Sequence, residues 1–364
     1  MTAPSAGYDV AAVVPSDYAA LAGFLAGFPG LGAPAEFWLG RFRLWWDENP
    51  AFRPEAARGW MLRRRGALCG FLSNAPGLMW AQGKPLRVFS VSTWMVLPEH
   101  RHASLDLLLK QMEEAKATLL FDTTPTEHVA AVLENLGFEN IPWGEDKESV
   151  ALLRPDLCLK ARFGAPSLVP DAAWRAGGWL LDRVQGLRLR RGRAGAGLKV
   201  ELAREAGPAF DRLWERTKAR HRLTNVRTSS VLRWHCFADR DVEKRLFACR
   251  AGEEVAGYLI AKANTRRGLK ALEVVDYWAD SDADGVFEAL LDGVLEHAAG
   301  AGFALASFGH FTPSFESSLR AAGLWEVPLT ARRNLVLAGP GAPVRAAEEG
   351  AYFTGLQGDY GTSP

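Results

Sequence analysis

The sequence predicts an α/β fold of the α+β kind, built as two similar domains that each hold a mixed, mostly antiparallel sheet flanked by helices. Short runs of β-branched and aromatic residues alternate with apolar residues at helical spacing along most of the chain. The same order of strands and helices occurs in both halves, as an architectural rather than a literal repeat. The length of 364 residues also exceeds the usual size of one domain, about 100–200 residues.

The first half contains strand and helix signals with clear stops. Pro29-Gly30 closes the first helix, Asn49-Pro50 closes the second, and Pro98 ends the central strand because proline cannot donate to a strand ladder. Gly137 stops the last helix of this half. The predicted elements are strand 8–14, helices 16–28 and 36–46, a hairpin over 59–74, strand 88–96, helix 104–112, strand 118–122, a helix ending at 136, and strand 149–154 closing the sheet.

The second half repeats this plan. The turn Ala251-Gly252-Glu253 joins two apolar runs and predicts a hairpin, as in the first half. Helical spacing resumes after each later strand. The predicted elements are strand 198–202, helices 208–220 and 229–237, a hairpin over 245–261, strand 271–278, helix 286–298, strand 303–308 and helix 315–322.

A segment of different composition separates the halves. Prolines and glycines flank one amphipathic helix, and the basic run 188–193 follows it. We interpret this as a helix docked between domains with a solvated charge cluster; a membrane-surface contact and an anchor for an anionic substrate are the alternatives. The predicted division is domain 1–160, linker 161–197, domain 198–340 and extended tail 341–364, in which Tyr352, Phe353, Leu356 and Tyr360 are placed to pack on a domain surface.

Bulk properties narrow the class of protein. A formal net charge of +1 gives no argument for a nucleic-acid partner. The four cysteines have neither paired nor metal-like spacing, which favours a reducing cytoplasm. We see no signal peptide and no uncharged apolar run near about 18 residues, so we expect a cytoplasmic protein without a transmembrane segment. The absence of HExxH, CxxC, Walker A and GxGxxG patterns predicts no metal and no nucleotide cofactor of those kinds.

The stretch from 89 to 112 joins a strand, a sharp turn and a helix. Unpaired N–H groups at such a helix start, together with the helix dipole, favour an anion. Val96, Pro98 and Arg101 at this turn, with Leu136-Gly137-Phe138 after the next strand and helix, resemble the pattern of the GNAT superfamily of acyl-CoA-dependent N-acyltransferases. The whole order, over about residues 8–338, is similar to tandem GNAT proteins, among them mycothiol synthase-like enzymes and acyltransferases acting on nucleotide-linked amino sugars.

The resemblance implies a donor site where the fourth and fifth strands of the first domain diverge. The turn lacks the glycines usual in the family, and Asp106 would repel a pyrophosphate unless it faces away. The corresponding turn of the second domain is acidic, so the first domain is favoured. By position, the pantetheine would run along Met95, Val96 and Leu97, and the pyrophosphate would lie among Arg101, His102, Ala103 and Ser104.

Amine acylation also needs a base for the ammonium proton and an acid for the departing thiolate. The tyrosine that often serves as the acid in the family corresponds here to Leu133, so other groups are required. The structural alternatives are solvated turn residues for Glu99 and His100, a helix-surface residue for His128 and a buried partner of an arginine for Asp276. The predicted catalytic residues are Glu99, His100, Asp276 and His310, with His128 as a further residue that could face the cleft.

The acceptor is expected to bind in the second half. Arginines suit a phosphate, and aromatic rings suit a base or sugar ring. A helix start with a buried tryptophan is the structural alternative. The predicted substrate-binding residues are Arg227, Arg233, Trp234 and Tyr277.

These observations lead to two functional hypotheses. The first is an N-acyltransferase that moves an acyl group from acetyl-CoA or a longer acyl-CoA to a primary amine of a small molecule by direct attack. An amino sugar carried on a nucleotide is the leading acceptor, with an amino acid, a peptide or a thiol precursor left open. The second is a non-catalytic scaffold or ligand-sensing protein, because both halves lack the glycine-rich turn and the tyrosine. The sequence leaves open whether the chain forms a homodimer.

Overall fold

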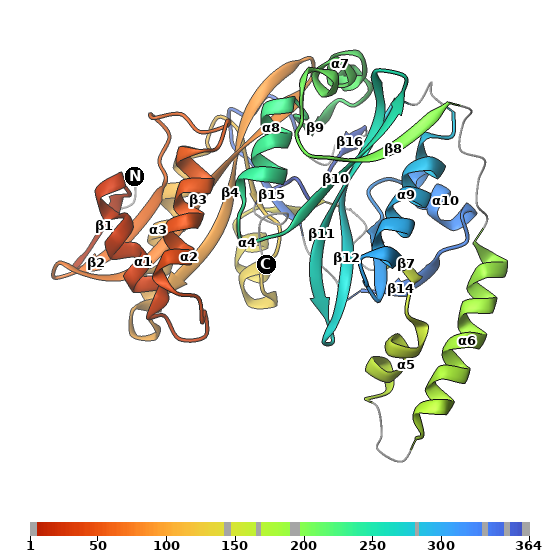
Figure 1. Ribbon diagram of the computed structural model, residues 1–364. Helices are drawn as coiled ribbons and strands as arrows, with labels where there is room; N and C mark the ends of the chain where they lie inside the picture. Colours follow the sequence, from red (N-terminus) through yellow and green to blue (C-terminus); the bar gives the residue numbers. More distant parts are fainter. Residues whose placement is uncertain are drawn as a thin grey trace.

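The computed structural model describes residues 6–141, 147–164, 169–189, 197–280, 284–329, 334–345 and 350–358. Within these residues the chain forms two mixed sheets side by side, of nine and seven strands, with helices packed against both (Figure 1). The predicted fold class, with two similar halves, is therefore confirmed. We call the part built on the nine-stranded sheet the first lobe and the other part the second lobe.

The first lobe follows the predicted order of elements. The short 3₁₀ segment Pro98–Ala103 lies between the central strand and its helix, so the turn is longer than a single loop. Its main elements are β1 (Tyr8–Ala12), α1 (Tyr18–Ala26), α2 (Ala35–Phe42), β2 (Gly59–Arg64), β3 (Ala67–Ala81), β4 (Lys84–Val96), α3 (Ser104–Glu114), β5 (Leu119–Asp122), α4 (Glu127–Asn135) and β6 (Glu139–Asn140).

The remaining chain supplies the second lobe, the linker and the tail, together with three strands of the first sheet. None of the helices in the described ranges is long and apolar enough to cross a membrane. The elements are β7 (Lys147–Leu152), α5 (Pro155–Phe163), α6 (Asp171–Arg188), β8 (Leu198–Ala203), α7 (Pro208–Thr217), β9 (Leu223–Asn225), α8 (Ser229–Arg233), β10 (Lys244–Ala251), β11 (Glu254–Arg266), β12 (Leu269–Ala279), α9 (Val286–Gly300), β13 (Leu305–Gly309), α10 (Pro313–Ala321), β14 (Trp325–Pro328), β15 (Leu335–Ala338) and β16 (Ala351–Tyr352).

Alternation along β2 and β3 places a separate core on each face of the first sheet. Met61 and Phe71 pack with α1, α2 and the π-helical turn that follows α2, whereas Leu62 and Leu72 pack with α3 and α4. Successive side chains of a strand point to opposite faces, so adjacent residues serve different helices. The tryptophans at 38, 45 and 46 are buried in the first of these cores, as their helical spacing predicts.

The two lobes exchange strands. β7 pairs antiparallel with β13 and β14 of the second sheet, so the prediction that 149–154 closes the first sheet is wrong. In return β15 lies between β5 and β6 of the first sheet. Each inserted strand covers an edge that would otherwise present unpaired N–H and C=O groups. The domain boundaries at 160/161 and 197/198 remain predictions, because each sheet holds a strand from the other half of the chain.

The linker and the tail are also more ordered than a single helix and an extended end. Two helices, α5 and α6, form a hairpin that projects from the second lobe (Figure 1). The tail adds β16 parallel to β9, which itself pairs with β3 of the first sheet. Tyr352, Phe353 and Leu356 are buried by this arrangement, while Tyr360 lies outside the described residues.

Candidate donor cavity and its surroundings

The fourth and fifth strands of the first lobe diverge. β4 pairs in parallel with β5 at two positions only, Phe89 with Leu120 and Ser90 with Phe121. A register shift against β3 falls between Phe71 and Ser73, and Thr93 has a φ of 48°. A bulge with a left-handed residue bends a strand and increases its twist. This bulge therefore separates the end of β4 from β5.

A cavity of about 560 Å³ lies beside the diverging end of β4. Aromatic and aliphatic side chains supply most of its wall, and polar groups come from the turn before α3, from the start of α3 and from α4. Such a combination of apolar wall and few polar groups is typical of small-molecule sites. The lining residues are Phe28, Trp94, Met95, Val96, Arg101, His102, Ser104, Leu105, His128, Val129 and Val132.

Five of the seven residues predicted to bind the donor line this cavity, namely Met95, Val96, Arg101, His102 and Ser104. The other two do not. The backbone N–H of Leu97 donates to Cys69 at 2.9 Å, and Ala103 is fully buried beneath the turn. Asp106, the expected source of repulsion, is not among the lining residues. The geometry thus collects a guanidinium, an imidazole and a helix start at one cavity.

Tyr8 on β1 holds the two histidines of the turn. Its hydroxyl lies 2.9 Å from Nδ1 of His100 and 3.1 Å from Nε2 of His102. His102 lines the cavity, whereas His100 and the exposed Glu99 line neither this cavity nor the one in the second lobe. Glu99 and His100 therefore lie outside the cavity, although the residues that follow them in sequence, Arg101 and His102, line it.

The second lobe has a cavity at the corresponding place. β12 pairs with β13 only from Ala271 to Val274, and a register shift follows in its ladder with β11. The cavity, of about 460 Å³, contains Tyr277, the only predicted substrate-binding residue among its described lining groups. Its lining is Arg220, His221, Tyr277, Trp278, Ala279, Asp280, Asp284, Gly285, Val286, Phe287, Glu288, Thr312, Ser314, Phe315, Ser318 and Tyr352.

This second cavity is less suited to a pyrophosphate. Asp280 receives N–H groups from Arg216 at 2.8 Å and from Arg220 at 2.7 Å, so two of the nearby cations are already neutralised. Asp284 and Glu288 add negative charge at the start of α9. Burial, with help from Arg227 and Arg220, lowers the pKa of His221 to about 4, which makes its ring neutral at pH 7.

Asp276 and Arg227 form a buried ion pair under this cavity. Arg227 donates from Nη2 to Oδ1 at 3.0 Å and from Nε to Oδ2 at 3.2 Å, and Tyr258 donates to Oδ2 at 2.8 Å. Both members of the pair are enclosed, and neither lines either of these two cavities. The arrangement matches the structural alternative for Asp276, a buried partner of an arginine, and gives Arg227 the same structural role.

Arg233 and Trp234 also lie away from both cavities. Nη1 of Arg233 donates to the carbonyl of Ala206 at 3.2 Å. Nε1 of Trp234 donates across the lobes to the carbonyl of Leu44 at 2.7 Å. These two contacts give Arg233 and Trp234 a role in holding the fold together. Among the predicted acceptor residues, Tyr277 is the one that lines the cavity of the second lobe.

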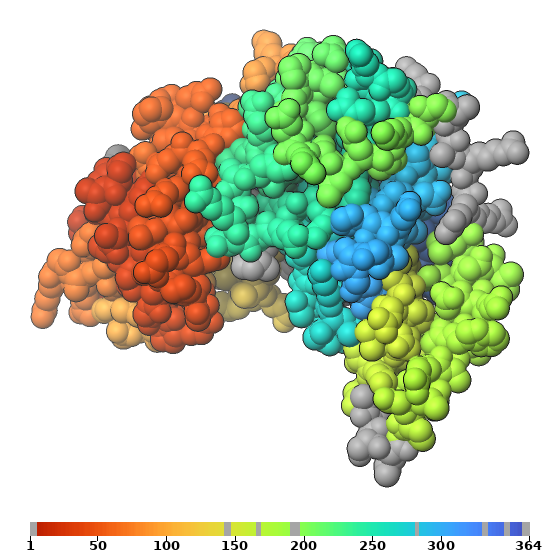
Figure 2. All heavy atoms as spheres, viewed as in Figure 1, coloured from red at the N-terminus to blue at the C-terminus, as the bar shows by residue number. Residues whose placement is uncertain are grey.

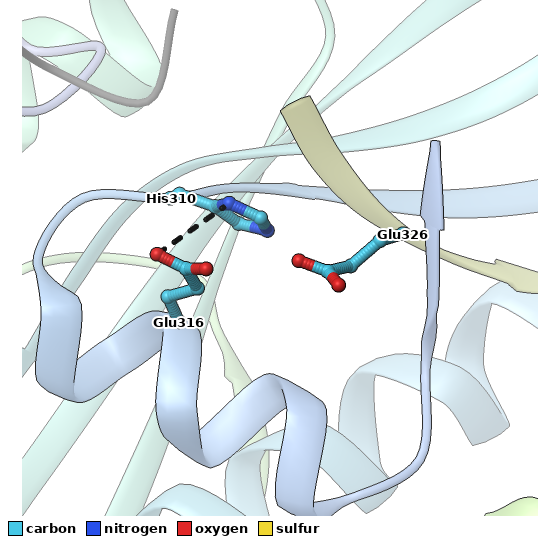
Figure 3. A group of neighbouring side chains, drawn as sticks. All are labelled: His310, Glu316 and Glu326. Atoms are coloured by element: carbon cyan, nitrogen blue, oxygen red, sulfur yellow. Dashed lines mark ion pairs between the residues drawn. The ribbon is translucent and has the colours of Figure 1, made fainter. Parts of the chain in front are cut away.

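His310 belongs to a polar cluster at the edge of the second sheet, with Glu316 on α10 and Glu326 on β14 (Figure 3). Its Nε2 lies 3.0 Å from Ser149 Oγ, and its Nδ1 lies 4.0 Å from Glu316. One potential ligand atom from each of the three residues falls within 4.8 Å of the others, although no metal was predicted. Arg320 reaches Glu316 at 2.6 Å and Glu326 at 3.0 Å, so it balances both carboxylates. Burial lowers the pKa of His310.

Sequence reasoning missed the apolar wall of the first cavity. Trp94, Leu105, Val129 and Val132 read as ordinary strand and helix residues, and Phe28 lies in a loop distant in sequence. Leu105 in the first turn of α3 is 42% exposed, whereas Leu107 and Leu108 are fully buried. This difference follows from packing, so the sequence alone does not mark Leu105 as a cavity residue.

Comparison with known proteins supports the fold. No protein-family model matches the chain, and no curated protein does. A GCN5-related N-acetyltransferase from Anabaena variabilis is 11% identical with a TM-score of 0.59, over 90% of this chain and 72% of that one. Another from Kribbella flavida is 14% identical with a TM-score of 0.57, over 92% and 72%.

A third similar structure carries an acyl thioester. Saccharomyces cerevisiae N-myristoyltransferase with bound myristoyl-CoA is 11% identical with a TM-score of 0.53, over 93% of this chain and 85% of that one. At these identities the likeness concerns the fold alone. The architecture of this chain is the one that GCN5-related and N-myristoyl transferases share.

Proposed function

We propose that this protein, which has the fold of N-acyltransferases, transfers an acyl group from a CoA thioester to a primary amine. The observation that carries the proposal is the cavity at the diverging end of β4, which opens against the start of α3 with Arg101, His102 and Ser104 in its lining. The fold supports the reaction class, because similar structures include N-acetyl and N-myristoyl transferases.

The residues of the cavity suggest how a thioester would be held. Arg101 is an exposed guanidinium beside a helix start, a combination that suits the oxygens of a pyrophosphate. The backbone of Met95 and Val96 lies past the last β4–β5 pair, where strand amides can hydrogen-bond the amide-containing pantetheine arm. Trp94, Val129 and Val132 offer an apolar wall to the acyl chain.

Proton transfer is assigned to the side chains that face this cavity. His128 on α4 supplies an imidazole in the lining, and we propose it as the base that takes the ammonium proton. Glu99 and His100 are the secondary proposal. They directly precede Arg101, which lines the cavity, but they do not line it themselves. Asp276 is not retained, because Arg227 and Tyr258 occupy its oxygens.

A small-molecule amine is the proposed acceptor, with a nucleotide-linked amino sugar as the leading candidate and the cytoplasm as the proposed location. Of the predicted acceptor residues, Tyr277 lines the cavity of the second lobe, and Arg227, Arg233 and Trp234 line neither of the two cavities described above. The acceptor is therefore the part of the proposal to be decided by a substrate screen.

Calorimetric titration with acetyl-CoA and with a longer acyl-CoA tests the donor site. We expect one site per chain, and we expect Arg101→Ala to weaken binding by about tenfold or more, as loss of a charge-assisted hydrogen bond predicts. Arg204→Ala is the matched control, because Arg204 is exposed and lines neither cavity. Equal affinity of the two variants would contradict the assignment of the pyrophosphate to this turn.

A non-catalytic ligand-binding role is the second candidate. It is favoured by the fully buried Leu133, where the family often has its acid, and by the turn without glycines. The two functions separate when thioester turnover is measured with a panel of amines. Saturable thioester binding without turnover of any amine would support the second role, and turnover that falls in His128→Ala would support the first.

A further inference from the structure

The hairpin of α5 and α6 projects from the second lobe, and its two helices pack against each other. Gly178 lets the helices meet closely, since a Cβ there would lie 2.6 Å from the backbone nitrogen of Asp156. The side chain of Gln185 fixes α6 to the body: it accepts from the backbone of Leu152 at 2.7 Å and donates to it at 2.8 Å. Figures 1 and 2 show the hairpin extending away from both sheets. The inner face of α6 therefore packs against α5 and β7.

The outer face of α6 is apolar and exposed. Trp179 is 61% exposed, Leu180 is 58% exposed and Leu187 is 87% exposed. Helical spacing places these three residues on the side opposite the packed Gly178 and Gln185, together with Arg183. The Arg183 guanidinium lies 5.3 Å from the centre of the Trp179 ring. We call Trp179, Leu180, Arg183 and Leu187 the outer stripe.

Charge distinguishes this part of the chain from the rest. Between residues 155 and 193 the sequence has eight Lys and Arg against three Asp, a net charge of +5. Three of these arginines, at 190, 191 and 193, lie outside the described residues, and the described helices α5 and α6 carry five Lys and Arg against three Asp, a net charge of +2. The whole chain carries +1, which leaves −4 for the remainder. One of the three acids, Asp171, is already paired with Lys160 at 2.7 Å. A positive segment on a negative molecule directs one end of the protein toward an anionic partner.

The outer stripe and the positive charge together indicate what kind of surface binds the outer face of α6. Trp, Leu and Arg on one exposed helix are typical of helices that lie in the interface of a membrane, with the rings and aliphatic groups inserted and the cations at the headgroups. A second copy of the chain would bring two hairpins of net positive charge together, which like-charge repulsion opposes. An anionic bilayer satisfies both the apolar stripe and the positive charge.

We propose that the α5–α6 hairpin docks the protein on an anionic lipid surface, with α6 lying in the plane of the interface. Trp179, Leu180 and Leu187 enter the boundary between headgroups and acyl chains, and Arg175 and Arg183 contact lipid phosphates. The helix lies on the membrane and does not cross it, since no helix of the described chain is long and apolar enough to span a bilayer. This docking holds the protein at the membrane while both cavities belong to the body of the molecule.

Vesicle co-sedimentation of the full chain tests the proposal. The vesicles are phosphatidylcholine alone and equal parts of phosphatidylcholine and phosphatidylglycerol. We expect binding to the anionic vesicles only, weakening as NaCl is raised. The double variant Trp179→Ser and Leu187→Ser should lose at least about tenfold in partitioning, since two large apolar groups leave the interface. The double variant Arg175→Gln and Arg183→Gln should lose about fivefold for each cation removed.

Controls keep folding and self-association separate from membrane binding. Leu202→Ser is the matched variant, because Leu202 is 47% exposed on β8 of the same lobe and lies outside the hairpin. It should bind as the original chain does. Sedimentation velocity in the absence of lipid measures association. The proposal is overturned by absent binding, by equal binding to neutral vesicles, by stripe variants that bind normally, or by a dimer that the stripe variants dissociate.

Discussion

At the scale of single residues, the pairing of buried charges decides which predicted groups are structural. Arg227 is fully buried and donates to Asp276, to the hydroxyl of Thr224 at 2.7 Å and to the carbonyl of Asn225 at 2.7 Å. Its guanidinium also lies 4.3 Å from the centre of the Trp278 ring. Removing one member of such a pair leaves the other as an uncompensated buried charge.

Arg227→Ala is therefore expected to lower the free energy of unfolding by about 3–5 kcal/mol. Equilibrium unfolding in urea measures the change. Arg233→Ala, at an exposed arginine six positions later, should change stability by no more than about 0.5 kcal/mol. Replacing both partners, with Arg227→Met and Asp276→Leu, should recover much of the loss. A single variant as stable as the original chain would refute the structural role.

A buried lysine near the junction of the lobes predicts a pH dependence. Nζ of Lys244 lies 2.6 Å from the carbonyl oxygen of His235 and 3.3 Å from Asp239, which also pairs with Arg41 of the first lobe at 3.2 Å. Burial outweighs the attraction of Asp239 and lowers the pKa of Lys244 from 10.5 to about 8. Between these two pH values the unfolded chain holds a proton that the folded chain has released.

Stability should consequently rise as the pH increases from 8 to 10.5, by up to about 3 kcal/mol for this group. Below pH 8 both states are protonated and the contribution is constant. Urea titrations across this window measure the slope, and Lys244→Met should flatten it relative to Lys262→Met, which removes another buried lysine of the same lobe. A slope that persists in Lys244→Met would assign the effect to other groups.

At the scale of elements, the exchanged strands connect distant parts of the chain. β15 comes late in the sequence, yet it pairs with β5 and β6 of the first sheet. Leu335 at its start is fully buried in the core that contains Leu107, Leu108 and Leu133. A residue from the C-terminal part of the chain thus supports the helices that border the proposed donor cavity.

Leu335→Ala is expected to lower the free energy of unfolding by about 2–5 kcal/mol, the usual range for a buried leucine. Hydrogen exchange should accelerate first in β5 and β6, which lose a packed neighbour, rather than in β10 and β11 of the second sheet. Leu202→Ala is the exposed control. Faster exchange confined to the second lobe would contradict the observed pairing of β15.

At the scale of the whole molecule, neither half of the chain contains its complete sheet. The first half lacks β15 and β9, which belong to the first sheet, and it carries β7, which belongs to the second. The tail strengthens the junction, because Gln357 lies 2.9 Å from Asn225 and Gly355 donates to the bulged Val275 at 2.7 Å. The lobes should therefore fold as one unit.

A chain cut within residues 165–168, between α5 and α6, tests this interdependence. We expect the two fragments to be insoluble or unfolded when expressed singly and to form one stable complex when expressed together, since each completes the sheet of the other. Size-exclusion chromatography and circular dichroism measure the outcome. A first fragment that is folded and monomeric by itself would contradict the dependence of the first sheet on β15.

Much of the local structure could be predicted from the sequence. The strand, turn and helix around Pro98 lie where the spacing of apolar residues changes from a period of two to a period of 3.6. Five of the seven residues predicted to bind the donor line one cavity. The catalytic prediction had less support, because a polar residue at a strand end can face a cavity or a buried partner. Asp276 faces Arg227, and only the packing reveals it.

The α/β class, the order of the elements and the turn after the central strand could be predicted from the sequence, because these depend on periodicity and on local stops such as Pro98 and Gly137. The partners of β7 and β15, the burial of Arg227 with Asp276 and the outward position of Trp179 follow only from the folded arrangement. Strand partners and buried pairs join residues far apart in the chain. The local pattern of apolar and polar residues does not specify which distant strand or side chain becomes the partner in the folded protein.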